Sequence, residues 1–209
     1  MMKCANKLIK ENLLLALVLC LLAAFAAVAA AETGELCPAG GSGIVTDAEA
    51  EWEQSYIRVS REGEESMIPV ETARVINFDT TIAMDPEYFT HHVRENVDTF
   101  VYDAWQGERE VYYSVCHVAD SCPSDLCEAL YQSYSGSYAA VNVLAVKVGS
   151  YDATAVLFDG ENACPTYQRH FFLIPVEDGC IVIEAQFDFE MYEGLYRIML
   201  SSFDALRIG

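Results

Sequence analysis

Lysine is nearly absent from this chain beyond its first residues, where Lys147 is the only one. The full sequence carries 32 acidic and 12 basic side chains, which gives a formal charge of −20 at pH 7. An excess of negative charge of this size repels phosphate backbones and anionic lipid surfaces. We therefore expect no nucleic-acid partner and no membrane partner for the mature chain. The charge favours a soluble protein that resists aggregation, or alternatively a surface that attracts cations or basic proteins.

Motifs that would indicate catalysis are also missing. The chain has no G-x-S-x-G turn to expose a nucleophilic serine. Its glycine cluster, Gly40–Gly43, is not followed by the lysine of a phosphate-binding loop. Carboxylates are abundant, but no spacing places two of them in environments that would separate their pKa values. We expect no catalytic residue, no cofactor and no enzymatic activity, with a secreted hydrolase using a carboxylate-lined cleft as the alternative.

A zinc knuckle is excluded because the chain contains no C-x₂-C pair. Cys116, His117, Cys122 and Cys127 nevertheless lie close in sequence and have the side chains that zinc prefers. If Cys122 caps a helix, Cys127 lies about 7 Å further along the helix axis and on another side of it. The sequence therefore predicts no metal site, although a Cys/His metal-binding protein stays open as a second alternative.

Two further groups of polar side chains could bind a ligand. His91 and His92 follow a turn with Asp85 and Glu87, but adjacent histidines on a loop are usually just solvated. Several tyrosines could line a groove, although such residues more often cover sheets and helices. These tyrosines are Tyr112, Tyr113, Tyr131, Tyr134 and Tyr138.

The N-terminus has the pattern of a secretory signal peptide over residues 1–31. Lys3, Lys7 and Lys10 precede an apolar run that ends in small residues, Ala29–Ala31. Removing residues 1–31 changes the formal charge from −20 to −22. A retained membrane anchor is the alternative, because the run approaches the length that spans a bilayer. We expect cleavage, and hence a secreted or extracytoplasmic protein of the cell envelope.

Residues 32–54 have the composition of an acidic flexible linker, and residues 55–209 are long enough for a single domain with its own core. Six cysteines follow the predicted cleavage site, and an even number in an exported chain favours disulfides. Cys37, in the linker, is the one most expected to stay unpaired or to bond another molecule. The disulfide candidates within the domain are Cys116, Cys122, Cys127, Cys164 and Cys180.

The domain reads as strands interrupted by one helix and closed by another. Apolar and β-branched runs bounded by turn residues predict the strands. A helix should begin around Cys122–Asp125, where Pro123 suits the first helical position. Another should follow the last hairpin, because Tyr192, Leu195, Met199, Phe203 and Leu206 recur at helical spacing. The predicted strands are residues 56–60, 67–78, 80–84, 98–102, 111–118, 141–148, 152–158, 171–176 and 180–187.

Tight turns between consecutive strands indicate an antiparallel sheet. The runs Phe171–Val176 and Cys180–Phe187 are apolar at both parities, so both faces of that sheet need cover. We therefore expect an α+β fold, a twisted antiparallel sheet in an α-β-α sandwich, in the order strands, helix, hairpin, hairpin and C-terminal helix.

Part of the domain, residues 72–208, resembles the PsbP/Mog1-like domains of exported bacterial proteins. The resemblance lies in Asp85–Phe89 after an extended run, Gly149–Ala153 opening a strand, Phe171–Pro175, Gly179–Glu184 and the closing Ser201–Phe203. It implies an α-β-α sandwich that serves as a non-catalytic accessory or binding module. We accordingly expect an envelope protein whose partner is a protein or a small ligand.

Overall fold

The computed structural model describes residues 53–61, 64–75, 78–94 and 97–209. The predicted signal peptide, Cys37 and nearly all of the predicted linker lie outside these residues. The described residues belong to one unit of the chain, Ala50–Gly209. Within that described part, no helix is long and apolar enough to cross a membrane.

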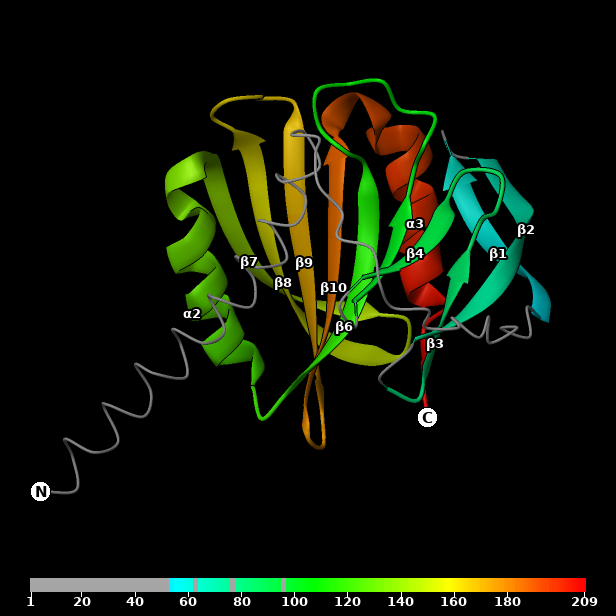
Figure 1. The fold of residues 1–209 in the computed structure, drawn as a ribbon, viewed down its shortest axis with the longest axis horizontal. Coiled ribbons are helices and arrows are strands. Elements are labelled where there is room, and N and C mark those ends of the chain that lie inside the picture. Colours follow the sequence, from blue (N-terminus) through cyan, green and yellow to red (C-terminus); the bar gives the residue numbers. More distant parts are fainter. Residues whose placement is uncertain (1–52, 62–63, 76–77, 95–96) are drawn as a thin grey trace, which may run out of the picture. The chain divides into compact units, whose positions relative to one another are not determined.

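The described strands form two antiparallel sheets (Figure 1). The smaller sheet has the order β1-β2-β3-β11, with β1 Glu53–Arg61, β2 Glu64–Val75, β3 Thr80–Met84 and β11 Arg207–Ile208. The larger sheet has the order β4-β5-β6-β10-β9-β8-β7. Its strands are β4 Thr90–Arg94, β5 Val97–Val101, β6 Tyr112–Ala119, β7 Tyr138–Val148, β8 Tyr151–Glu161, β9 Tyr167–Val176 and β10 Gly179–Asp188.

The α+β class and the antiparallel pairing are confirmed, but the strands do not form one sheet as we predicted. The division falls at the predicted Asp85 turn, where the backbone nitrogens of Tyr88 and Phe89 both donate to the Asp85 carbonyl. The Asp85 side chain also accepts from the Glu87 nitrogen at 3.0 Å. This turn carries the chain out of the smaller sheet and into β4, and only β11 returns to pair with β3.

Both predicted helices are present. Helix α2, Pro123–Tyr134, begins with Cys122 as N-cap residue and Pro123 at its start, and continues into a short 3-10 turn, Ser135–Ser137. The C-terminal segment is less regular than predicted: a 3-10 turn, Phe189–Met191, leads into a π-helical turn, Tyr192–Tyr196, and then into α3, Arg197–Asp204. Its predicted stripe is confirmed at Leu195, Met199, Phe203 and Leu206, all of which are buried.

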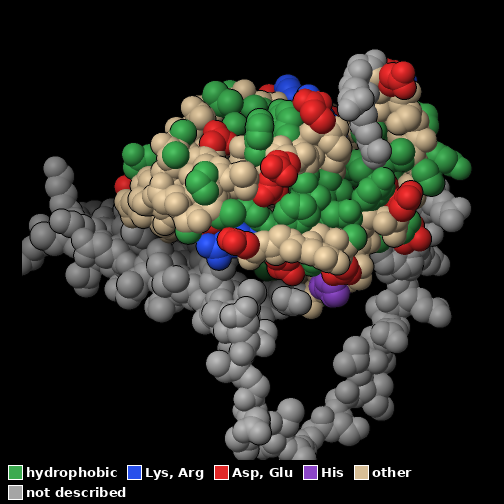
Figure 2. All heavy atoms as spheres, turned by 90° about the horizontal axis from the view of Figure 1, so that it is seen from above, with side chains coloured by type: hydrophobic (Ala, Val, Ile, Leu, Met, Phe, Trp, Pro, Cys, Tyr) green, Lys and Arg blue, Asp and Glu red, His purple; other side chains and the backbone are tan. Residues whose placement is uncertain are grey.

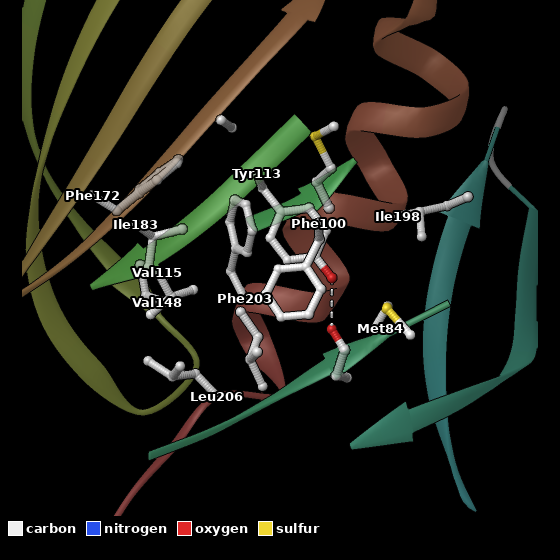
Figure 3. Close-up of a cluster of buried hydrophobic side chains, with 14 of the residues drawn as sticks. Met84, Phe100, Tyr113, Val115, Val148, Phe172, Ile183, Ile198, Phe203 and Leu206 are labelled. Atoms are coloured by element: carbon white, nitrogen blue, oxygen red, sulfur yellow. Dashed lines mark hydrogen bonds between the residues drawn. The ribbon is translucent and has the colours of Figure 1, made fainter. Parts of the chain in front are cut away.

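The main hydrophobic core lies on one face of the larger sheet, where α3 packs (Figure 3). Phe203 of α3 meets the ring of Tyr113 on β6 at 5.5 Å, and Tyr113 stacks on Phe100 of β5 at 4.5 Å. The buried Tyr113 hydroxyl donates to the Ala83 carbonyl of β3 at 3.0 Å, which ties the two sheets together across the core. In Figure 1, α3 stands between the larger sheet and the β1–β2 pair.

Helix α2 covers the opposite face of the larger sheet, over β8 and β9. Its buried side chains are Leu126, Ala129 and Leu130. The Tyr134 ring packs on Phe158 of β8 and Phe171 of β9, with centroid distances of 5.4 and 5.7 Å. Each face of this sheet therefore receives one helix, as the apolar strands require.

Candidate functional site

The edge strand β7 carries two exposed large apolar side chains at neighbouring positions. It ends the strand order, with β8 as its only neighbour among the described strands. Its residues carry no charge from Tyr138 to Val146. Val143 is 55% exposed and Leu144 is 49% exposed. A long, uncharged edge strand presents unpaired backbone groups to which another strand can bond.

Val143 and Leu144 lie on opposite faces of the sheet. Val143 is opposite Val156, and Val156 is opposite Phe171, which packs against α2. Leu144 is opposite Ala155, which is part of the α3-side core. Exposed apolar side chains on both faces of one edge strand suit the addition of a further strand, because a new strand would cover both at once.

The other edge of the larger sheet differs in length and composition. Strand β4 has five residues and includes His91 and His92, whereas β7 has eleven. On β7 the one charged side chain, Lys147, lies near the end of the strand and pairs with Asp152 at 2.7 Å. Natural sheets usually protect long edges with charges, prolines or bulges.

We define the β7 edge as residues Tyr138–Val148. On the α2 side of this edge, Tyr131 of α2 is 55% exposed and adds a further exposed apolar side chain.

A buried ion pair lies on the α2 face of the sheet. Arg169 of β9 meets Glu184 of β10 at 3.2 Å, and both side chains are largely shielded from solvent. The Tyr112 hydroxyl donates to Glu184 at 2.7 Å, and the Arg169 guanidinium lies 5.0 Å from the Tyr134 ring centroid. Gln186 accepts a hydrogen bond from Arg169 and donates one to the Glu110 carbonyl. The Glu184 carboxylate is therefore buried with both a counter-ion and a hydrogen-bond donor.

The electrostatics of this pair are those of a closed structural site. Burial alone would lower the pKa of Arg169, but the charge of Glu184, together with the three tyrosines Tyr112, Tyr134 and Tyr138, raises that pKa overall. Burial raises the pKa of Tyr134 to about 12 and, together with Glu184, raises that of Tyr112. These groups therefore stay protonated at neutral pH, and no proton-transfer role follows from their pKa values.

The structure brings together three of the five tyrosines that could have lined a groove. Tyr112, Tyr134 and Tyr138 surround Arg169, and each affects its pKa. Tyr113 is buried on the other face, and Tyr131 is exposed on α2. The three tyrosines shield the ion pair, as covering residues do, and the sequence offered no signal for this because they come from three separate elements.

The loop of residues 102–111, which connects β5 to β6 at one end of the larger sheet, is held by Tyr167 and Glu161. The Trp105 indole donates to the Tyr167 hydroxyl at 2.6 Å, and Arg109 makes two hydrogen bonds to Glu161 at 3.0 and 3.1 Å. A hollow of about 220 Å³ at this loop is lined by residues of the loop itself and by Val101, the last residue of β5. Figure 2 looks onto this end and shows acidic side chains spread among apolar ones. Pockets for drug-sized ligands are usually larger, roughly 300–1,000 Å³.

The histidines lie on strands and not on a loop, so that prediction was wrong for His91 and His92. His91, opposite Phe100 in the β4–β5 ladder, stacks on that ring and meets Asp98 at 2.8 Å. An imidazole paired and stacked in this way fits a half-buried strand position. The strand with which β4 pairs, Val97–Val101, was predicted from the sequence, but β4 itself was not.

His170 forms a second imidazole–carboxylate pair on the α3 face. Its ring meets the Tyr196 hydroxyl at 2.7 Å and Asp159 at 3.1 Å. The hydrogen bond from His170 outweighs desolvation and lowers the pKa of Asp159, which also accepts from Asn142 of β7. His170 is buried and packs against the Phe187 ring. The arrangement is a structural polar network beneath the helix.

The five disulfide candidates are all free thiols in the structure, so a disulfide stays a prediction. Cys116 lies on β6, Cys180 is the second residue of β10, Cys122 is the N-cap residue of α2 and Cys127 lies in its first half. Cys164 lies before β9, at the other end of the sheet. No group of three or more His, Cys, Asp or Glu side chains in the described residues has an arrangement that could hold a metal ion.

These features define the class of the protein only broadly, as an α+β protein of two antiparallel sheets with an exposed apolar edge strand. The chain matches no known protein family and no curated protein.

Proposed function

We propose that this protein is a non-catalytic accessory or binding module of the cell envelope, and that it binds a protein partner by adding a strand of that partner along the β7 edge. The observation that carries this proposal is the uncharged length of β7 with Val143 and Leu144 exposed on opposite faces. Backbone hydrogen bonds would supply the affinity, and pockets for alternate side chains would supply the specificity.

The charge of the molecule favours a partner that is not another copy of this chain. Two copies of the cleaved chain, each with a formal charge of −22, repel one another, whereas a segment with basic residues beside an apolar core is attracted. We therefore propose an extended segment with alternating apolar side chains and flanking lysine or arginine. Association with such a segment should weaken as salt rises, because screening reduces the attraction.

The sandwich is proposed to be of the PsbP/Mog1-like α-β-α kind, with α2 on one face of the larger sheet and α3 on the other, where the smaller sheet packs on the far side of α3 (Figure 1). This arrangement leaves the β7 edge free of helix cover on the described residues of that strand. The proposal also includes an extracytoplasmic location, for which the N-terminal pattern is the support.

The test uses Val143→Lys combined with Leu144→Lys, and Met67→Lys on the exposed β2 strand as the matched control. We expect the double variant to lose at least tenfold in affinity for a partner captured from the native envelope, while M67K binds as the unaltered chain does. Hydrogen exchange should slow at the β7 amides when the partner is bound. Equal binding by the double variant would contradict the proposal, as would a complex that contains only this chain and tightens with salt.

A further inference from the structure

Four cysteines gather where β6, β10 and the start of α2 meet. Cys180 is opposite Val118, and Val182 is opposite Cys116, so Cys116 and Cys180 lie on the same face of the larger sheet. Glu184 shares that face and is opposite Phe171, which packs against α2. Helix α2 brings Cys122 and Cys127 to the same side.

A backbone hydrogen bond joins the residues that lead into α2 and into β10. The Asp120 backbone nitrogen donates to the Asp178 carbonyl at 2.9 Å, and Asp120 has a positive φ of 54°. Cys122 follows Asp120 by two residues, and Cys180 follows Asp178 by two residues. The backbone just before Cys180 also approaches β6 closely, because a side chain in place of Gly179 would collide with the Val118 carbonyl. This contact holds the two cysteine-bearing segments together.

The four thiols differ in exposure. Cys180 is fully buried and Cys122 is exposed. Burial, with smaller contributions from Cys116, Cys122 and Cys127, raises the pKa of Cys180 to about 12, so all four cysteines are close enough to interact electrostatically. Cys122 is therefore the sulfur that meets an external oxidant first.

Other pairings fit less well. Cys116 and Cys180 are diagonal neighbours on adjacent strands, at about 7–8 Å, beyond the range of about 4.4–6.8 Å between the Cα atoms of a disulfide. Cys164 precedes Tyr167 at the opposite end of β9 from Pro175, the residue opposite Cys180, which is roughly 25 Å away at the rise of a strand. Cys122 and Cys127 are five residues apart on one helix, on different sides of it.

We propose that Cys122 and Cys180 are an oxidisable pair that clasps α2 onto the larger sheet. The oxidant is a disulfide of the small-molecule or dithiol-oxidase class, written RSSR. The Cys122 thiolate attacks one sulfur of RSSR and expels RS⁻; the Cys180 sulfur then attacks Cys122 in the mixed disulfide and expels the second RS⁻. Two electrons pass from the protein to RSSR, and the two thiol protons end on two RSH molecules.

The clasp restricts the unfolded chain between Cys122 and Cys180, and should therefore raise the thermal midpoint by about 5 °C or more. It acts at the end of α2 remote from Tyr134. This proposal does not depend on strand addition at β7. If the Cys122–Cys180 disulfide does not form, the proposed binding at β7 is unaffected.

The test treats the reduced full chain with oxidised glutathione, blocks the remaining thiols and maps the linked peptides. We expect a Cys122–Cys180 peptide together with the rise in midpoint. Cys122→Ser should abolish both, and Cys164→Ser, the control, should keep both; because Cys122 is exposed, its loss leaves the reduced fold stable. Free thiols at both positions, a bridge from Cys180 to any other cysteine, or one zinc ion retained by the reduced chain that blocks oxidation would overturn the proposal.

Discussion

The two faces of the larger sheet are built in different ways. On the α3 face, Phe100, Tyr113 and Phe203 pack ring on ring, and the Tyr113 hydroxyl reaches the smaller sheet. On the α2 face, a single helix covers strands that carry an ion pair, Arg169–Glu184, and its shielding tyrosines. The comparison teaches that apolar packing holds the two sheets together, whereas α2 packs through apolar side chains over a sheet face that also holds a buried ion pair.

The largest expected effect tests the α3 face. Phe203→Ala should lower the free energy of unfolding by about 4 kcal/mol, because the ring is buried between Tyr113 and Phe172 and its loss leaves a cavity. Phe189→Ala, an exposed phenylalanine, is the control and should change it by less than about 0.5 kcal/mol. Urea unfolding measures both. Equal losses would show that the core does not lie where we place it.

The α2 face should respond next. Glu184→Gln leaves the Arg169 charge without its buried counter-ion and should cost about 3 kcal/mol. Lys147→Ala breaks the exposed pair with Asp152 and should cost less than about 0.5 kcal/mol.

A double variant, Arg169→Met with Glu184→Leu, sharpens this test. It removes both charges together and should recover most of the loss, because no buried charge is then left unpaired. Recovery in the same urea unfolding experiment would show that E184Q is unstable because a buried charge is left unpaired, and not because the attraction between the two charges is lost. A double variant as unstable as E184Q would contradict this explanation.

The smallest effect concerns the polar network under α3 and its dependence on pH. The folded-state pKa of Asp159 lies below its unfolded value because His170 donates to it, so this stabilisation is present above pH about 4 and is lost as pH falls through the folded pKa. Asp159→Asn should be less stable by about 1 kcal/mol at pH 7. Thermal melts from pH 7 to pH 3 should show this difference shrinking. A constant difference would mean that the carboxylate charge contributes nothing.

Much of the fold was accessible from local patterns. Turn residues and apolar runs predicted nearly every strand of the larger sheet, and Pro123 marked the start of α2, because these features depend on neighbours within a few residues. The β4 strand was missed, since His91 is stabilised by Asp98 and Phe100 from the next strand. The division into two sheets was missed because it depends on where the chain turns after Met84.

The candidate sites were less predictable. The sequence identified the five cysteines and the expectation of a disulfide, but it could not choose a pair. Only the register of β6 and β10 and the Asp120–Asp178 contact brought Cys122 and Cys180 to one place and removed Cys164 to the other end. Similarly, Tyr138–Val148 reads as an ordinary apolar strand until the strand order makes it an edge.

By itself the sequence determined the acidic charge, the missing catalytic motifs, the α+β class and the positions of most elements, because composition and periodicity are local properties. The tertiary structure alone decided which strand became the free edge, which carboxylates met Arg169, His91 and His170, and which thiols came together. The physical reason is that these pairings join residues from separate elements, and their free energy depends on burial and geometry that exist only after the strands have packed.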